Sequence, residues 1–253
     1  MATPNEITLY TEGTPNGLKA SIALEELGLD YKVRSMKLYE QEQKEPWFLA
    51  INPNGRIPAL TAKAENGEEL KIFESGAILE YLVATYDKDH KISYPYGSKE
   101  HWETVSWLMW QMGGIGPIQG QANHFFGAAP EKIEYAINRY VNESRRLYRV
   151  MDAHLANNPH GYLVGDRLTI ADIAVWPWTC GWKSCGLQTM EEFPHVQKWM
   201  QKLLERPGFE RGRNVPAPHY HLELNKLPEE EVVKLMRTRS AWVLEAMKKD
   251  ADA

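Results

Sequence analysis

The chain has 253 residues, enough for one large domain or two ordinary ones, and a net charge of −5 spread along its length. Nothing in this balance indicates a nucleic-acid or membrane-surface partner, and no apolar run approaches the roughly 20 residues that cross a bilayer. The first residues lack the pattern of a signal peptide, and two cysteines outside any metal-ligand spacing are too few for a disulfide framework. We therefore expect a soluble, reduced, cytoplasmic protein without a metal.

The N-terminal third begins with a strand–helix–strand pattern. Residues 7–10 alternate as a short strand does, residues 18–27 have the apolar spacing of a helix, and residues 31–38 resemble a second strand. The turn before the helix contains Thr14 and Asn16, and either residue can cap it, with the first N–H groups directed at whatever lies above the strand. The pattern predicts a right-handed βαβ unit.

A β-hairpin is predicted next, because an Asn-Gly pair at 66–67 separates two short strand patterns over residues 57–62 and 70–73. Pro58 cannot donate to a strand ladder, so it belongs at the first residue of a strand or at an edge. It is also a candidate for a cis peptide bond, which would turn the backbone of Ile57 outward to meet a ligand.

A second helix, over residues 74–85, follows the hairpin. Glu74 and Ser75 stand at its N-terminus, where free N–H groups and the helix dipole favour an anion. We therefore hypothesise an anionic, peptide-like ligand between Ile57 and Ser75. Taken alone, these residue types are also those of an ordinary helix start. Residues 40–48, upstream, are expected to form a polar loop or short helix.

The rest of the chain changes to long helices after a linker rich in Pro, Gly and Tyr. Thr169 and Asp172 form a capping box, a structural feature whose loss is expected to cost about 1 kcal/mol or more. Glycines and Pro117 interrupt the first helix. The predicted helices span residues 100–112, 130–154, 170–178, 193–204 and 228–247. The predicted division is a βαβ-ββα domain over 1–87, a linker over 88–98, an all-helical domain over 99–213 and a C-terminal extension with a helix over 214–253.

Together these motifs resemble the glutathione transferase superfamily over nearly the whole chain. The ordered set consists of Ile57-Pro58, then Glu74-Ser75-Gly76-Ala77-Ile78, then Thr169-Ile170-Ala171-Asp172. The runs 14–17, 53–58 and 110–117 look like one branch, which holds the Nu-class bacterial disulfide-bond oxidoreductases and fungal transferases akin to the yeast nitrogen-catabolite regulator. The resemblance implies an α/β thioredoxin-like N-terminal domain, an all-α C-terminal domain, a homodimer and glutathione as co-substrate.

The resemblance also implies roles for single residues. Glu74 and Ser75 would hold the γ-glutamyl carboxylate and amine of glutathione. The backbone of Ile57 would pair with the cysteinyl amide, which explains a cis Pro58. Asn16 occupies the position where other classes have a catalytic Tyr, Ser or Cys.

Four further residues enter the implied glutathione site. Gln43 and Arg56 occupy positions that in this branch reach the glycyl end, although Gln43 can equally be a solvated loop residue and Arg56 a surface turn residue. Arg139 matches a branch arginine that contributes to the site from its own or the partner subunit. Thr14 completes the set, beside Asn16.

The implied chemistry requires the thiolate of glutathione, which a helix N-terminus and one side-chain donor can stabilise without a general base. Asn16 is the candidate catalytic residue because its amide N–H₂ can donate; alternatively it only caps its helix. Thr14 is a weaker rival donor, and Tyr10 ranks third because strand aromatics usually serve packing. Cys180 and Cys185 form no Cys-x-x-Cys motif, so any disulfide reduction would use glutathione thiols, plausibly two in one site.

Three functions stay open. The leading one is an enzyme that directs the glutathione thiolate at an electrophile, as in detoxification, or at a small disulfide. The second is a non-catalytic glutathione-binding or regulatory protein, and the third a dedicated biosynthetic transferase, with the tail from Asn214 as a pocket lid or simply a packing helix. His124 is expected to be packed or on the surface. The aromatic and Met cluster is expected to be mostly core, with some members lining an electrophile pocket: Trp107, Trp110, Met112, Phe125, Trp176 and Trp178.

Overall fold

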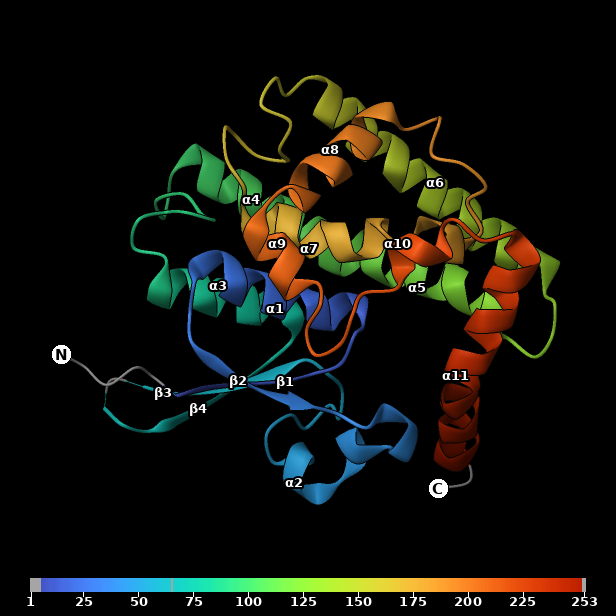
Figure 1. Ribbon diagram of the computed structural model, residues 1–253, viewed down its shortest axis with the longest axis horizontal. Helices are drawn as coiled ribbons and strands as arrows, with labels where there is room; N and C mark the ends of the chain where they lie inside the picture. Colours follow the sequence, from blue (N-terminus) through green and yellow to red (C-terminus); the bar gives the residue numbers. More distant parts are fainter. Residues whose placement is uncertain (1–5, 65, 252–253) are drawn as a thin grey trace.

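The computed structural model describes residues 6–64 and 66–251, the side chains of 248–251 excepted, and begins with a four-stranded mixed sheet (Figure 1). The strand order is β2-β1-β3-β4, with β1 parallel to β2 and the other two pairs antiparallel. The strands span Ile7–Thr11 (β1), Tyr31–Ser35 (β2), Ala59–Lys63 (β3) and Glu69–Phe73 (β4). The predicted βαβ unit and hairpin are both confirmed.

Two strand boundaries differ from the sequence patterns by more than one residue. The strand β2 ends before Leu38, where the chain turns into the first of two 3-10 helices, and β3 begins at Ala59 rather than Ile57. The second difference has a direct cause, since Pro58 has no N–H for the ladder. The connecting elements are η1 (Leu38–Glu40), η2 (Glu42–Lys44) and α2 (Pro46–Leu49).

The helices α1 (Pro15–Leu27) and α3 (Ser75–Tyr86) cover one face of the sheet and lie between it and the helical domain, whereas α2 lies on the other side (Figure 1). Gly28 ends α1 with φ of 69°, a left-handed conformation that favours glycine.

A helical domain follows the linker. Its elements are α4 (Lys99–Trp110), η3 (Gln111–Ile115), α5 (Gly116–Asn123), η4 (His124–Ala128), α6 (Glu134–Ala156), α7 (Ile170–Thr179), η5 (Trp182–Cys185), α8 (Pro194–Leu204), α9 (Pro207–Gly212), α10 (His221–Leu224) and α11 (Glu229–Ala251). Within the described residues, no helix combines the length and apolarity needed to cross a membrane.

The expected interruption after residue 112 is wrong, because the helical path continues from α4 through α5 to the end of η4. The segment that contains Gly113 and Gly114 is a π-helical turn, which widens the helix without ending it. Pro117 lies in the first turn of α5, directly after this π-helical turn, and the helical path continues through it. A second π-helical turn, η4, follows α5 directly.

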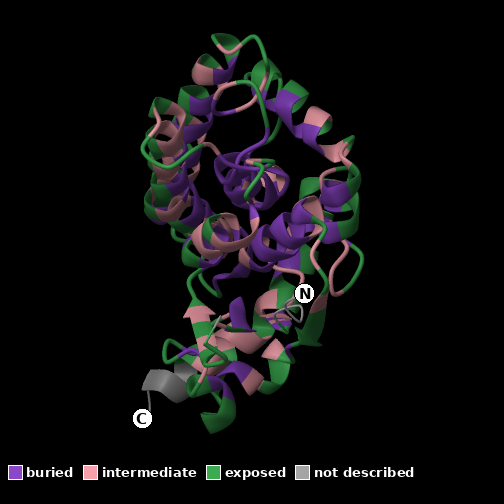
Figure 2. Cartoon of the chain, turned by 90° about the vertical axis from the view of Figure 1, so that its left-hand side faces the viewer, coloured by how far each residue is buried: buried purple, intermediate pink, exposed green. Residues whose placement is uncertain are grey.

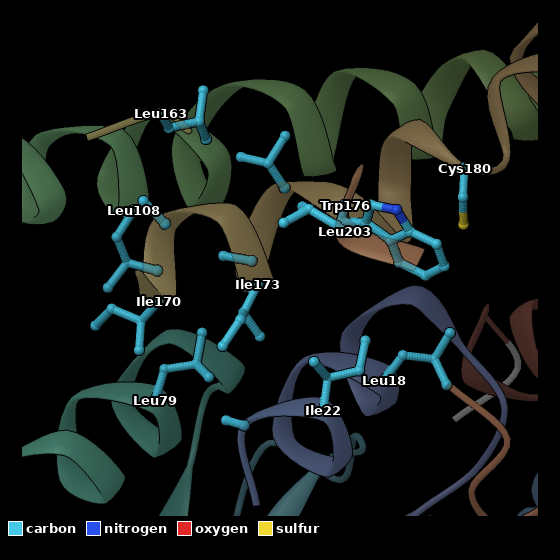
Figure 3. Close-up of a cluster of buried hydrophobic side chains, with 14 of the residues drawn as sticks. Leu18, Ile22, Leu79, Leu108, Leu163, Ile170, Ile173, Trp176, Cys180 and Leu203 are labelled. Atoms are coloured by element: carbon cyan, nitrogen blue, oxygen red, sulfur yellow. The ribbon is translucent and has the colours of Figure 1, made fainter. Parts of the chain in front are cut away.

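The centre of the helical domain is α7, which is almost wholly buried (Figure 2). Its apolar residues Ile170, Ile173 and Trp176 point toward Leu79 of α3 and Ile22 of α1 (Figure 3). One apolar core therefore runs through both domains, and each fully buried side chain of this size contributes roughly 1.5–3 kcal/mol.

The predicted capping box at the start of α7 is confirmed. The Asp172 carboxylate accepts hydrogen bonds from the Thr169 N–H (3.0 Å) and the Thr169 hydroxyl (3.1 Å). Its other oxygen accepts from the Leu163 N–H at 2.9 Å and the Trp199 indole N–H at 2.8 Å. Asp172 therefore does more than cap a helix, because it also ties α7 to α8 inside the core.

Candidate functional site

Three chain turns meet at one edge of the sheet. Tyr10 near the end of β1 pairs with Ala59 at the start of β3, and Ala59 pairs with Phe73 at the end of β4. This register places the loop after β1, the Ile57-Pro58 bond and the start of α3 side by side. Most of the predicted site residues come from these three turns.

Thr14, and not Asn16, caps α1. The Thr14 hydroxyl accepts a hydrogen bond from the Gly17 N–H at 3.1 Å, and Pro15 occupies the first turn. A side chain at position 17 would be only 2.3 Å from the Glu12 carbonyl oxygen, so glycine is required there. The sequence left the cap open between Thr14 and Asn16, and in the structure Thr14 is the cap.

We predict that Thr14→Ala destabilises the protein by about 1 kcal/mol, since an N-cap contributes about that much. Urea unfolding monitored by tryptophan fluorescence measures the change. Thr14→Ser retains the capping oxygen and is the matched control, expected within a few tenths of a kcal/mol of the parent. An equal loss in both variants would show that the methyl group, rather than the cap, matters.

Asn16 is held by a residue 162 positions away. Its amide oxygen accepts a hydrogen bond from the indole N–H of Trp178 at 3.1 Å. An indole N–H can only donate, so the oxygen must face Trp178, and the N–H₂ group of Asn16 faces away from Trp178. Among the described residues no hydrogen bond from this N–H₂ group is present, so it can donate to a ligand at the start of α1.

Tyr10 serves packing. Its ring lies 6.2 Å from that of Trp47 and 6.0 Å from that of Phe48, within a small cluster under η1 and α2. This agrees with its low rank among the candidate donors.

The Ile57-Pro58 bond is cis, as expected. Ile57 is half-buried and precedes β3, so its backbone N–H and C=O lie outside the strand ladder. The Asn52 amide donates to the neighbouring Arg56 carbonyl at 2.6 Å and thereby holds the turn. The backbone of Ile57 therefore has no partner in the sheet.

Glu74 and Ser75 differ sharply in environment. Glu74 is exposed, with φ of 69° and ψ of 119°, a conformation that non-glycine residues rarely adopt and that costs roughly 1–3 kcal/mol. Such outliers cluster at ligand sites. Ser75 is only 3% exposed and begins α3.

Sequence reasoning missed Lys19. This side chain is 1% exposed, and its ammonium donates to the Ser75 hydroxyl at 3.1 Å and to the Gln111 side-chain oxygen at 2.6 Å. The Ser75 hydroxyl itself donates to the sulfur of Met112 at 3.7 Å, a weak acceptor that a ligand oxygen could replace. Burial lowers the pKa of Lys19 to about 7, and the charge of Glu74 opposes this shift. A lysine on the otherwise apolar face of the first helix was the available signal.

Gln43 and Arg56 flank the site at the η2 side. Gln43 is 5% exposed, and its side-chain oxygen has no hydrogen-bond partner among the described residues. The expected alternative of a solvated loop residue is therefore wrong for Gln43. Gly55, with φ of 59°, lies so close to Gln43 that a side chain there would be 3.0 Å from its carbonyl oxygen. Arg56 is exposed, so the turn-residue alternative stays open for it.

Arg139 is not brought to this edge. It is an exposed residue of α6 and lines a separate surface cavity of about 500 Å³ with Tyr135 and Glu143. A contribution to the site of the same chain finds no support in this placement, and a contribution to a partner's site stays a proposal.

Both cysteines are buried, and burial keeps their thiols protonated. Burial raises the pKa of the Cys180 thiol far above its usual range and that of Cys185 to about 12. Within the described part of the chain, no three His, Cys, Asp or Glu side chains are grouped so as to hold a metal.

Two cavities open beside the start of α1, and α11 forms a wall of both. One has about 850 Å³ and the other about 300 Å³, and both are lined by Thr14, Tyr220 and Arg239. The guanidinium of Arg239 lies 3.6 Å from the centre of the Tyr220 ring. The tail is therefore more than a packing helix. Trp178 and His124 line the smaller cavity, whereas Trp176 is core.

A thioredoxin-like sheet with a cis-proline at its edge, followed by a helical domain, defines a glutathione-binding transferase fold. Comparison with known protein families gives the same assignment. The chain matches the model of the glutathione S-transferase N-terminal domain over residues 5–84 and that of the C-terminal domain over residues 77–207. It belongs to the glutathione S-transferase family.

Relatives place the chain in the branch indicated by its motifs. It is 42% identical to the disulfide-bond oxidoreductase YfcG of Escherichia coli over 204 residues, which is 80% of this chain and 92% of that protein. A glutathione transferase homologue of Lodderomyces elongisporus, with two glutathione molecules per subunit, is 45% identical at a TM-score of 0.78, covering 83% of this chain and 99% of that one. The transferase URE2P6 of Phanerochaete chrysosporium, in complex with oxidised glutathione, is 42% identical at a TM-score of 0.76, covering 84% and 96%.

Proposed function

We propose that the protein is an enzyme that binds glutathione at the sheet edge and stabilises its thiolate, for transfer to an electrophile or for reduction of small disulfides. The observation that carries the proposal is the oriented amide of Asn16, held by Trp178 at the N-terminus of α1. Glu74, Ser75 and the Ile57 backbone lie on the same edge and suit the γ-glutamyl and cysteinyl parts of the tripeptide.

The charges at the site support this placement. Glu74 is a carboxylate that can pair with the γ-glutamyl ammonium, and Ser75 can donate to the γ-glutamyl carboxylate at the N-terminus of α3. Lys19 adds a positive charge directly behind Ser75. Gln43 offers a buried polar side chain, and Arg56 an exposed charge, for the glycyl end.

Disulfide reduction in this site would use two glutathione molecules. The first thiolate attacks the disulfide and expels one thiolate, which takes up a proton, leaving a mixed disulfide. The second glutathione thiolate attacks that mixed disulfide, so glutathione disulfide forms and the second thiol leaves. The two-glutathione and oxidised-glutathione complexes of the relatives are compatible with this route. Cys180 and Cys185 are too deeply buried to replace either thiol.

The remaining parts of the proposal concern organisation. We propose a cytoplasmic homodimer in which residues 1–87 bind glutathione, 88–98 link the domains, 99–213 form the helical domain and 214–253 form an extension. Arg139 would act in the partner's site. The placement of α11 beside both cavities favours a restricted substrate range and keeps a dedicated biosynthetic transferase as the second candidate.

The test is turnover of the purified protein with glutathione on a small disulfide and on an aromatic electrophile, assayed in parallel. We expect turnover on at least one of them, with glutathione bound stoichiometrically in a separate titration. Disulfide turnover alone would support the two-glutathione route, and conjugation alone would support the transferase. Glutathione binding with neither activity would contradict the proposal and favour the regulatory protein.

A further inference from the structure

A chain of hydrogen bonds in the helical domain ends at Asn16. The hydroxyl of the buried Tyr148 in α6 donates to the side-chain oxygen of Gln119 in α5 at 3.1 Å. The N–H₂ group of Gln119 donates to the carbonyl oxygen of Trp178 in α7 at 2.6 Å. The indole N–H of Trp178 then donates to the Asn16 oxygen at 3.1 Å. The chain joins α6, α5 and α7 to the first turn of α1.

Gln119 is a fixed link in this chain. It is 1% exposed, and both ends of its amide are paired. A carbonyl oxygen can only accept, so the N–H₂ group of Gln119 must face Trp178 and its oxygen must face Tyr148. Turning this buried amide would leave both ends without a suitable partner, which is costly. Gln119 therefore holds the backbone of Trp178 in one place.

The same face of α5 also receives the Trp178 ring. Gly116, Gln119 and Gly120 lie on one face of the helix, because they are three or four positions apart. A Cβ atom at Gly116 or Gly120 would already be in contact with the indole ring, at 3.5 Å. Side chains larger than alanine would crowd the ring there. Trp178 is thus held against α5 by its carbonyl and by its ring.

The orientation of the Asn16 amide decides whether it assists or opposes a thiolate. Its N–H₂ group donates, whereas its oxygen carries partial negative charge and accepts. With the indole N–H in place, the oxygen is held by Trp178 and the N–H₂ group faces the other way. Without the indole N–H, rotation of the amide brings the oxygen to the position of the donor. Trp178 therefore excludes the orientation that would repel a thiolate.

We propose that Trp178 and Gln119 are positioning residues, through which the helical domain holds the donor end of Asn16 toward the glutathione thiolate. Both act indirectly, since Gln119 holds Trp178 and Trp178 orients Asn16. The reactivity of a thiol bound in the N-terminal domain is thus set in part by α5 and α7. The inference rests on the proposed function, because it requires that Asn16 faces the thiolate.

The test is the pKa of the thiol of glutathione bound to the full-length protein, measured by ultraviolet absorbance of the thiolate across a pH series. Trp178→Phe retains a ring against α5 and removes the indole N–H. We expect it to raise the thiol pKa by about 0.5–1 unit, as the loss of one hydrogen bond allows. Gln119→Leu should raise the thiol pKa by less. S-methylglutathione, which has no thiol, should bind to both variants as tightly as to the parent.

Gln119→Leu is suited to this test because it leaves neither neighbour unpaired. The Trp178 carbonyl also accepts from the Gly181 N–H at 3.2 Å. The Tyr148 hydroxyl also reaches the Thr179 carbonyl at 3.4 Å. The variant therefore keeps a partner for each of these buried groups and loses only the link between α6 and Trp178.

A double-mutant cycle separates positioning from a general loosening of the fold. In the Asn16→Ala background, Trp178→Phe and Gln119→Leu should leave the thiol pKa at the value of Asn16→Ala alone, because no amide remains to be oriented. Additive shifts in the double variants would overturn the inference. An unchanged thiol pKa in either single variant would overturn it as well.

Trp107→Phe is the matched control. This half-buried tryptophan of α4 packs against Trp110 and His154, with ring centres 5.0 Å and 4.4 Å away, and among the described residues it lines neither cavity beside α1. Its thiol pKa should equal that of the parent. The proposed function is tested separately, since an unchanged thiol pKa in Asn16→Ala would contradict the donor itself. A raised pKa in Asn16→Ala with no change in Trp178→Phe would contradict only the positioning role.

Discussion

Asn16→Ala is expected to lower kcat/KM with glutathione by about 10–100-fold and to raise the pKa of the bound glutathione thiol by about 1–2 units. A hydrogen bond to a charged group contributes about 1.5–3 kcal/mol, and 1.36 kcal/mol corresponds to one pKa unit. Because Trp178 directs the Asn16 N–H₂ group away from itself, that group can donate to a thiolate at the start of α1. Ultraviolet absorbance of the bound thiolate across a pH series measures the pKa, and steady-state kinetics measure the turnover.

Two further variants test the cause of that effect. Asn16→Asp has nearly the same shape but replaces the donor by a negative charge, so its loss of activity should exceed that of Asn16→Ala. Asn157→Ala changes an exposed asparagine at the end of α6 that lines none of the cavities described above, and it should be as active as the parent. Unchanged turnover together with an unchanged thiol pKa in Asn16→Ala would contradict the assignment of Asn16 as the donor to the thiolate.

Lys19→Met should weaken the binding of S-methylglutathione about tenfold at acidic pH and have a smaller effect as the pH rises. In the parent, burial lowers the pKa of Lys19 to about 7, and a ligand carboxylate at Ser75 favours the charged form. Binding should therefore take up a proton, and the affinity of the parent should fall as the pH rises through about 7. S-methylglutathione has no thiol, so calorimetric titration across this range isolates the lysine.

Stability gives an independent check on the same lysine. The folded protein releases the proton of Lys19 near pH 7, whereas the unfolded chain retains it up to about the ordinary value of 10.5. The unfolded state thus binds more protons between these values, and this group makes the free energy of unfolding rise with pH, by at most about 1.4 kcal/mol per unit. Urea unfolding at about pH 7 and 9 should therefore show a larger rise in the free energy of unfolding for the parent than for Lys19→Met. Lys63→Met, at an exposed position, should follow the parent, and parallel curves for parent and Lys19→Met would contradict the prediction.

Much of the architecture could be predicted from short stretches of sequence. The Asn-Gly pair at 66–67, the apolar spacing of α1 and α7, and the box of Thr169 and Asp172 are local signals, since each acts over a few residues. They specified the hairpin, the main helices and the order of the two domains. The resemblance of ordered motifs added the family. Pro58 also indicated the edge at which a ligand is expected, because a residue without an N–H ends a ladder.

The tertiary structure decided which candidates meet and how they are oriented. Thr14 and Asn16 were equivalent as caps in the sequence, and Trp178, which is 162 residues from Asn16, determines which way the Asn16 amide faces. Lys19 reaches Gln111 across 92 residues, and no local pattern connects them. The extension became a cavity wall only through contacts of α11 with η4, η5 and η1. Such contacts depend on the packing of whole elements against one another, whereas caps, turns and apolar periodicity depend on neighbours in the chain. For this reason caps, turns and periodicity can be predicted from the sequence alone, and the long-range contacts cannot.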